Sequence, residues 1–268
     1  MFPNVRISSR GAKPRPILAK VEDLGRDLVL VGGQAVNFWA HVYEHRVPTV
    51  ARDAPFTSKT LTSAAIQRSV RICAERLNGR ARVATSDDAT PNSGTVVFAD
   101  ADGVSRTLDV VSAPFGLDGA EVHDTALAVE IVDDAGASTG VRFYVIHPVL
   151  SMESRVHNTV GLPGAYDTEQ GRKQLRVSIL CAREYMLDVL DGRIDAEQPP
   201  RTVLKLNERI FRFSMRDHHA KELYRMKGVD PAEAIVDDPR LPTAFRQKRL
   251  PQMKDQLFAR PREAAANT

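Results

Sequence analysis

The spacing of apolar residues divides this chain into a strand-rich part and a helix-rich part. Up to His147-Pro148, short runs of β-branched and aromatic residues alternate with turn residues, which is typical of β-strands. After this dipeptide, apolar residues recur every three or four positions, as they do on one face of a helix. We therefore predict an α/β fold in which a mixed β-sheet flanked by helices is followed by a C-terminal helical domain.

The same pattern predicts where the individual elements lie. Strands are expected at residues 28–33, 60–62, 81–85, 95–99, 105–111, 127–133 and 141–146. Helices are expected at 17–27 and 34–45, and from residue 66 to Leu77, before the stop signal Asn78-Gly79. The predicted domains are a flexible basic arm at 1–16, the α/β domain at 17–147, the helical domain at 148–262 and a polar tail at 263–268.

Length and composition favour an ordinary soluble protein. A chain of 268 residues can bury a sizeable core. No apolar run is long enough to span a bilayer, and the first residues lack the apolar core of a secretory signal, so we expect a cytoplasmic protein with no membrane partner. Cys73 and Cys181 lie on apolar helical faces and are predicted to be reduced core residues.

Charge is distributed unevenly along the chain. Residues 201–268 hold 15 Lys and Arg against 9 Asp and Glu, and residues 1–16 carry four basic residues and no acid. Two basic ends therefore flank a more acidic middle. This asymmetry suits a polyanionic partner such as RNA, although a solvated helix surface gives the same distribution.

The segment from Leu28 to Trp39 carries the first indication of chemistry. An apolar run ends in Gly32-Gly33 and passes directly into helical spacing, which predicts a strand, a tight turn and a helix. Glycine allows a ligand to approach the backbone closely, and the amino end of the helix offers N–H groups to a phosphate. A plain strand-to-helix turn without a ligand is the alternative.

The second indication is Asp109, in the middle of the predicted strand 105–111. Strand alternation places Leu108 and Val110 on one face and Asp109 on the other, among apolar residues. Burying an unpaired carboxylate costs several kcal/mol in order of magnitude, so a metal, a basic side chain or a substrate must compensate it. A structural partner and a functional site both satisfy this requirement.

The order of these features resembles the nucleotidyltransferase superfamily, which has the DNA polymerase beta-like fold, and more narrowly its AbiEii-like branch. The resemblance rests on the strand ending in Gly32-Gly33, the loop Thr57-Ser58-Lys59 with the strand after it, and the later strand with Asp109. The C-terminal segments Glu153–Asn158 and Gly171–Arg176 also resemble the helical part of such proteins. The AbiEii-like branch includes toxins of bacterial toxin-antitoxin pairs.

The resemblance implies Mg²⁺-dependent transfer of a nucleotide from an NTP to RNA or protein, and a toxin-like setting would add a neutralising protein partner. By this resemblance Gly32, Gly33, Ser58 and Lys59 would bind the nucleotide, and Asp109 would be a catalytic metal ligand. Two further cations, Arg155 and Lys173, alternate with apolar stripes and are either solvent-facing or directed toward triphosphate or nucleic acid.

The chain departs from the family pattern at the metal site. The family has Asp-x-Asp where this chain has Thr60-Leu61-Thr62, so one carboxylate remains of three. Neutral hydroxyls compete poorly with water for Mg²⁺, so we expect weak or absent Mg²⁺ binding and impaired catalysis. Asp87-Asp88 and Asp100-Ala-Asp102 could substitute, although their turn-like context favours a structural role.

Three hypotheses remain open. The chain is an impaired nucleotidyltransferase, a catalytically inactive relative that binds nucleotide, nucleic acid or protein, or a zinc hydrolase at His41-Val-Tyr-Glu44-His45, which has an H-x-x-E-H spacing. If either of the first two is right, Gly32-Gly33, the threonine pair and Asp109 should converge.

Overall fold

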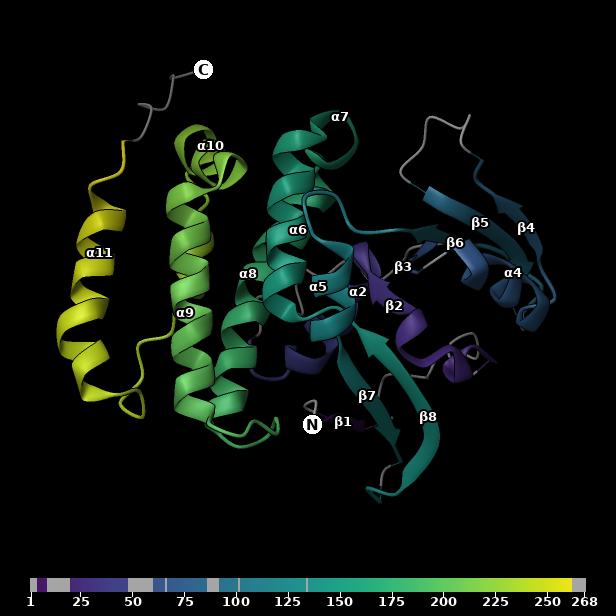
Figure 1. The fold of residues 1–268 in the computed structure, drawn as a ribbon, viewed down its shortest axis with the longest axis horizontal. Coiled ribbons are helices and arrows are strands. Elements are labelled where there is room, and N and C mark those ends of the chain that lie inside the picture. Colours follow the sequence, from purple (N-terminus) through teal and green to yellow (C-terminus); the bar gives the residue numbers. More distant parts are fainter. Residues whose placement is uncertain are drawn as a thin grey trace.

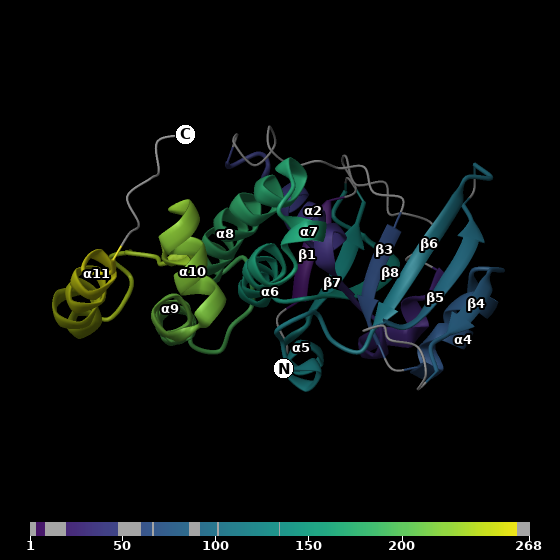
Figure 2. The same cartoon turned by 90° about the horizontal axis from the view of Figure 1, so that it is seen from above.

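One mixed β-sheet lies beside a block of helices (Figure 1). The computed structural model describes residues 4–8, 20–47, 60–65, 67–85, 92–100, 102–133 and 135–261. Seen from above, the helices of the C-terminal half extend away from one part of the sheet (Figure 2). The α/β fold class predicted from the sequence is confirmed.

The described residues form eight strands of one sheet. They are β1 (Asn4–Ser8), β2 (Val29–Val31), β3 (Thr60–Ala64), β4 (Arg80–Val83), β5 (Asn92–Ala99), β6 (Ser105–Val111), β7 (Leu127–Val132) and β8 (Ser138–Val145). Their order is β1-β7-β8-β2-β3-β6-β5-β4. The sheet is mixed, because β1, β2 and β3 run parallel to β7, β8 and β6, respectively, whereas the other pairs are antiparallel.

The helices of the described part fall into two groups. The helices that alternate with the strands along the chain are η1 (Glu22–Asp27), α2 (Gly32–Tyr43), α4 (Gln67–Arg76) and α5 (Gly119–Thr125). Those of the C-terminal half are α6 (Pro148–Gly161), α7 (Pro163–Tyr166), α8 (Glu169–Leu190), α9 (Pro199–Arg216), α10 (His218–Lys227), η2 (Pro231–Ala234), η3 (Phe245–Arg249) and α11 (Leu250–Phe258). None of these helices has the length and apolarity that a membrane crossing requires.

The amino-terminal segment corrects one prediction. Residues 1–16 were expected to form a flexible arm, but Asn4–Ser8 is the edge strand β1, paired in parallel with β7. Val5 is buried there, which supplies the apolar contact that holds the strand. The nearby Pro, Gly and Ser residues hide this short strand signal in the sequence. The other residues of the expected arm lie outside the described part of the chain.

Two further differences concern short helices. The expected helix at 17–27 is described from Lys20, and its regular part is the 3₁₀-helix η1, interrupted at Gly25, where φ is +52°. Helix α5 was not predicted at all. It begins where Asp118 caps the N–H groups of Ala120 and Glu121, a short-range signal that the sequence contains.

Helix α2 connects the sheet to the C-terminal helices. Its Trp39 is fully buried and donates a hydrogen bond to the carbonyl of Ile146, 3.0 Å away. Just beyond α2, the guanidinium of Arg46 binds both carboxylate oxygens of Asp188 on α8 at 2.7 Å. One hydrophobic core therefore runs from the sheet into the helical half, and the division at residue 148 stays a prediction. Within the described part of the chain, Cys73 and Cys181 form no disulfide, and both are buried in this core, as expected.

Candidate functional site

Strand register brings three of the predicted site residues together. In the β2–β3 pair, Val31 lies opposite Thr62, so Gly32 follows directly beside this threonine. In the β3–β6 pair, Thr62 lies next to Asp109. Neighbouring residues in register project from the same face of a sheet, so the side chains of Thr62 and Asp109 share one face. The diglycine turn, Thr62 and Asp109 therefore lie together; for the other member of the threonine pair, Thr60, only the backbone register is described.

The turn into α2 requires glycine at its first position. Gly32 has a φ of +67°, in the left-handed region that L side chains rarely adopt. A Cβ on Gly32 would also lie 3.3 Å from Cβ of Thr62. The chain can therefore leave β2 and begin α2 tightly against β3. Val31 gives this helix no side-chain cap, and its first turn holds no acidic residue.

Arg155 of α6 lies beside this first turn. It is only 4% exposed, and its Nη2 lies 3.9 Å from the position that a Cβ would take on Gly32. The guanidinium donates one hydrogen bond, from Nη1 to Oε1 of Gln174 at 3.1 Å, and packs 5.3 Å from the ring centre of Tyr166. Burial lowers the pKa of Arg155, and no described carboxylate pairs with it. A buried cation thus faces the amino end of α2.

Gln174 of α8 completes this side of the site. A Cβ on Gly33 would lie 2.8 Å from Nε2 of Gln174, so the second glycine leaves the space that the amide occupies. The side chain is 7% exposed. The two glycines therefore have different tasks: Gly32 supplies the backbone conformation, and Gly33 admits the amide that holds Arg155.

Asp109 contributes the negative charge of the site. Its strongest influence is burial, which raises the pKa of the carboxyl, and a hydrogen bond with Thr95 on β5 partly offsets this. Thr95 lies directly opposite Asp109 in the β5–β6 pair. No cation contributes to the shift. Thr95 is thus the structural partner, and the carboxylate keeps a lone pair for a ligand.

Helix α4 covers the other face of this part of the sheet. A Cβ on Gly94 of β5 would lie 2.9 Å from the side chain of Val70 in α4, and Gly94 pairs with Val110. Val110 and Leu108 are buried, as the strand alternation predicted. Asp109 projects to the opposite face, where α2 begins. The geometry therefore combines a cationic group and a helix amino end, suited to an anion, with one carboxylate and a hydroxyl.

The structure does not bring every predicted residue into this group. Lys173 lies on α8 beside Gln174, but its ammonium pairs with Glu169 at 2.8 Å, one helical turn away. Ser58 and Lys59 lie outside the described residues. Of Thr60 only the backbone is described, in register with Thr107 on β6.

The described parts of the alternative acidic motifs and of the H-x-x-E-H motif do not form a metal site. Asp100 accepts hydrogen bonds from the N–H groups of Asp102 and Val104 and pairs with Arg106, so it stabilises a turn, as the sequence favoured. Asp87-Asp88 lies outside the described part. Nδ1 of His41 pairs with Glu44 at 3.1 Å. Among the described residues, the cluster of His, Cys and carboxylate side chains that could hold a metal ion does not include His41, Glu44 or His45.

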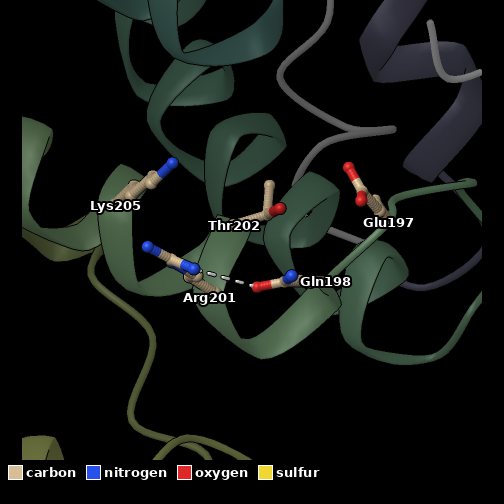
Figure 3. A pocket seen from close by; sticks show the side chains of 5 residues that line it. All are labelled: Glu197, Gln198, Arg201, Thr202 and Lys205. Atoms are coloured by element: carbon tan, nitrogen blue, oxygen red, sulfur yellow. Dashed lines mark hydrogen bonds between the residues drawn. The ribbon is translucent and has the colours of Figure 1, made fainter. Parts of the chain in front are cut away.

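A separate hollow of about 260 Å³ lies at the start of α9 (Figure 3). Figure 3 shows the residues that line it: Glu197, Gln198, Arg201, Thr202 and Lys205. Arg201 donates to Gln198 at 3.3 Å. This hollow shares no residue with the group around Gly32.

Sequence reasoning missed Gln174, Thr95 and the burial of Arg155. The signal for Arg155 is its position three residues after Met152, which is fully buried on α6. Gln174 likewise lies three residues after the buried Gly171 and four before Ser178. Helical spacing therefore places both polar side chains on the packed face, where a buried polar group needs a partner.

No protein-family model matches this chain, and no curated protein matches it closely enough to indicate a relationship. We therefore infer function from the geometry of the site.

Proposed function

We propose that the residues around the first turn of α2 bind the phosphates of a nucleoside triphosphate, in a nucleotidyltransferase-like protein with impaired transfer activity. One observation carries this proposal: Arg155 is buried beside Gly32, and no described carboxylate neutralises it. A buried cation without a counter-ion is costly, and an anionic ligand would offset that cost. Guanidinium and a helix amino end are both suited to phosphate oxygens.

The remaining residues have defined tasks in this proposal. Gly32 and Gly33 let the phosphates approach the backbone, and Gln174 orients Arg155 through the 3.1 Å hydrogen bond. Lys173, Ser58 and Lys59 remain candidates for contacts with the nucleotide. The acceptor of a transferred nucleotide would be RNA or a protein, and a toxin-like role would require a neutralising protein partner.

The described donor atoms do not fit a pair of Mg²⁺ ions. Two-metal transfer uses several carboxylates, because Mg²⁺ prefers charged oxygen ligands. Here Asp109 is the one carboxylate in register with Thr62. We therefore assign no catalytic step to a metal pair. A second candidate function is a catalytically inactive relative that binds nucleotide, nucleic acid or protein, which the position of Thr62 beside Asp109 favours.

Nucleotide binding is tested by calorimetry with each of the four common NTPs, with tripolyphosphate and with an unphosphorylated nucleoside. We expect wild-type protein to bind the phosphorylated ligands and Arg155→Met to bind them about 10- to 100-fold more weakly, the effect of losing a charged hydrogen bond. Arg176→Met is the matched control, because Arg176 lies exposed on α8. Equal binding by wild type and Arg155→Met would contradict the proposal.

Catalysis is tested with each labelled NTP, Mg²⁺ or Mn²⁺ and total RNA. Label transfer that is lost in Asp109→Ala would establish an active enzyme. Transfer only by the Thr60→Asp, Thr62→Asp double variant would identify a site that has lost its metal ligands. Nucleotide binding without transfer in either protein would favour the inactive relative.

A further inference from the structure

A second group of chemically active side chains lies where α10 meets α6. His157 of α6, Asp217 before α10 and His219 in its first turn each offer one ligand atom, and these three atoms lie within 4.8 Å of one another. His157 is buried, whereas Asp217 and His219 are partly exposed. None of the three belongs to the group around Gly32.

The atoms of this group are already oriented. Nε2 of His157 lies 3.1 Å from Oδ2 of Asp217. The other oxygen, Oδ1, accepts the N–H of Ala220 at 3.0 Å, so the carboxylate is held by the helix that it caps. Nδ1 of His157 is buried with no hydrogen-bond partner in the described structure. Nε2 is thus the nitrogen that contacts Asp217, whereas Nδ1 lies against Gly116, where an added Cβ would be 1.8 Å away.

Two aromatic rings limit the freedom of the imidazoles. Phe213 packs against His157 with ring centres 5.4 Å apart, and Phe115 packs against His219 at 6.2 Å. The two imidazoles are themselves 5.3 Å apart, centre to centre. Helix α6 thus carries one ligand in a packed position, and the N-cap residue and first turn of α10 carry the two partly exposed ones.

We propose that His157, Asp217 and His219 bind one first-row transition metal ion, with Zn²⁺ as the expected occupant. Two imidazoles and a carboxylate are the ligand types that Zn²⁺ takes, whereas Mg²⁺ and Ca²⁺ prefer oxygen atoms alone. Bond lengths of about 2.0 Å place two tetrahedral ligand atoms about 3.3 Å apart, close to the separation of Nε2 and Oδ2. The ligand atom of His219 lies within 4.8 Å of the other two, so binding would have to draw it closer to reach the same separation.

Three protein ligands leave a fourth position of the ion open to water. The ion would cross-link α6 to α10, two helices joined in this region by the hydrogen bond between His157 and Asp217. Because Nδ1 of His157 has no acceptor, the site lacks one outer partner that supports a ligating imidazole. We therefore expect an affinity about 10- to 100-fold below that of a site with complete outer partners.

This inference does not depend on nucleotide binding. Arg155 and His157 are two residues apart on α6, so they project about 200° apart around the helix axis. The metal test can therefore fail while the phosphate test succeeds, and the reverse.

The test uses the full chain without an affinity tag, stripped with a chelator and titrated with Zn²⁺ against a chelating dye. We expect one Zn²⁺ bound per chain at this site. The variants Asp217→Asn and His219→Gln should each weaken binding at least 10-fold. Asparagine also caps helices well, so Asp217→Asn keeps the start of α10 intact. His218→Gln is the matched control, because His218 is an exposed neighbour that pairs with Glu222 instead.

Co²⁺ provides an independent readout of coordination. We expect visible absorption bands typical of tetrahedral Co²⁺ in wild type and in His218→Gln, and their loss in the two ligand variants. Thermal unfolding without metal checks that each variant is folded. Absence of stoichiometric Zn²⁺ binding, or equal binding in wild type, Asp217→Asn and His219→Gln, would overturn the proposal. Loss of binding only in His218→Gln would also overturn it.

Discussion

Arg155 donates a hydrogen bond from Nη1 to Oε1 of Gln174, across 3.1 Å between α6 and α8. Among the described residues, the amide oxygen of Gln174 accepts a hydrogen bond from a guanidinium that is only 4% exposed. A neutral amide satisfies part of the hydrogen-bonding capacity of a guanidinium but none of its charge. The folded protein therefore holds the positive charge of Arg155 beside Gly32, and burying this charge lowers the free energy of unfolding.

Because burying the charge of Arg155 is unfavourable, replacing Arg155 and Gln174 together by apolar residues should cost little stability. We expect the double variant Arg155→Met, Gln174→Leu to unfold with a free energy within about 1 kcal/mol of wild type, or higher, because removing both polar partners is nearly neutral. Urea unfolding followed by circular dichroism measures this difference. A loss of several kcal/mol would show that the pair is structural.

Arg209 offers the contrasting control. Its guanidinium binds both oxygens of the buried Glu153 at 2.7 Å and also pairs with Glu121. Burial raises the pKa of Glu153, and the hydrogen bond with Arg209 opposes this increase. Arg209→Met would leave that carboxylate buried without its partner, so we expect a loss of about 3–5 kcal/mol.

The turn into α2 gives a second prediction. Gly32→Ala would force an alanine into a φ of +67°, which costs about 1–2 kcal/mol, and would crowd Thr62 at 3.3 Å. Gly228→Ala is the matched control, because Gly228 has a φ of +64° and open space around its missing Cβ. We expect Gly32→Ala to lower the free energy of unfolding more than Gly228→Ala does. Equal losses would show that contact with Thr62 is unimportant.

Asp109 and Asp100 should respond to pH in opposite ways. Burial raises the pKa of Asp109 in the folded state, so its contribution to stability is present below the unfolded pKa and is lost as pH rises through the folded value. Asp109→Asn should therefore increase stability at pH 7 relative to wild type, with a smaller gain at pH 4. Urea unfolding at both pH values measures this change.

Asp100 provides the control with the opposite sign. The hydrogen bond with Arg106 lowers the pKa of Asp100, with help from the N–H groups of Val104 and Asp102. The stability that Asp100 contributes is present above the pKa of this carboxyl in the unfolded chain, and it is lost as pH falls through the lower pKa of the folded state. Asp100→Asn should therefore reduce stability at pH 7 and have less effect in acid. Identical pH responses of the two variants would contradict the assignment of both carboxyl groups.

The sequence predicted the parts of the fold that depend on local pattern. Strand alternation correctly placed Asp109 on the face opposite Leu108 and Val110, because side-chain direction in a strand has a period of two. Strand β1 was not predicted because its formation depends on pairing with β7, more than 100 residues away in the chain. A five-residue edge strand carries too little periodicity to be recognised without its partner.

The candidate site likewise combines features that have a local sequence signal with features that depend on packing between distant segments. The glycine turn and the mid-strand acid have local signals, and the register of β3 between β2 and β6 brings them together. The partnership of Arg155 with Gln174 has no local signal, because it depends on how α6 packs against α8. Arg155 and Lys173 look alike in the sequence, but one is buried beside Gly32 and the other pairs with Glu169.

His147 gives a final prediction, which concerns the start of α6. Its Nδ1 accepts the N–H of Val149 at 3.2 Å, so the imidazole caps the helix only while Nδ1 is unprotonated. Burial, together with the charge of Arg209, lowers the pKa of His147 to about 3. The folded state therefore binds fewer protons than the unfolded state between pH 6.5 and pH 3, and stability is lost as pH falls through this window.

Replacing this imidazole should reduce the sensitivity to acid. Asparagine caps helices without titrating, so the stability of His147→Asn should depend less on pH than that of wild type, by up to about 1.4 kcal/mol per pH unit below pH 6.5. At pH 7 the variant should be less stable by about 1 kcal/mol, because the ring contact with Tyr185, 4.5 Å between centres, is lost. Urea unfolding at half-unit steps from pH 7 to pH 4 measures both effects. Parallel stability curves for the two proteins would mean that the folded state accepts a proton on His147 as readily as the unfolded chain.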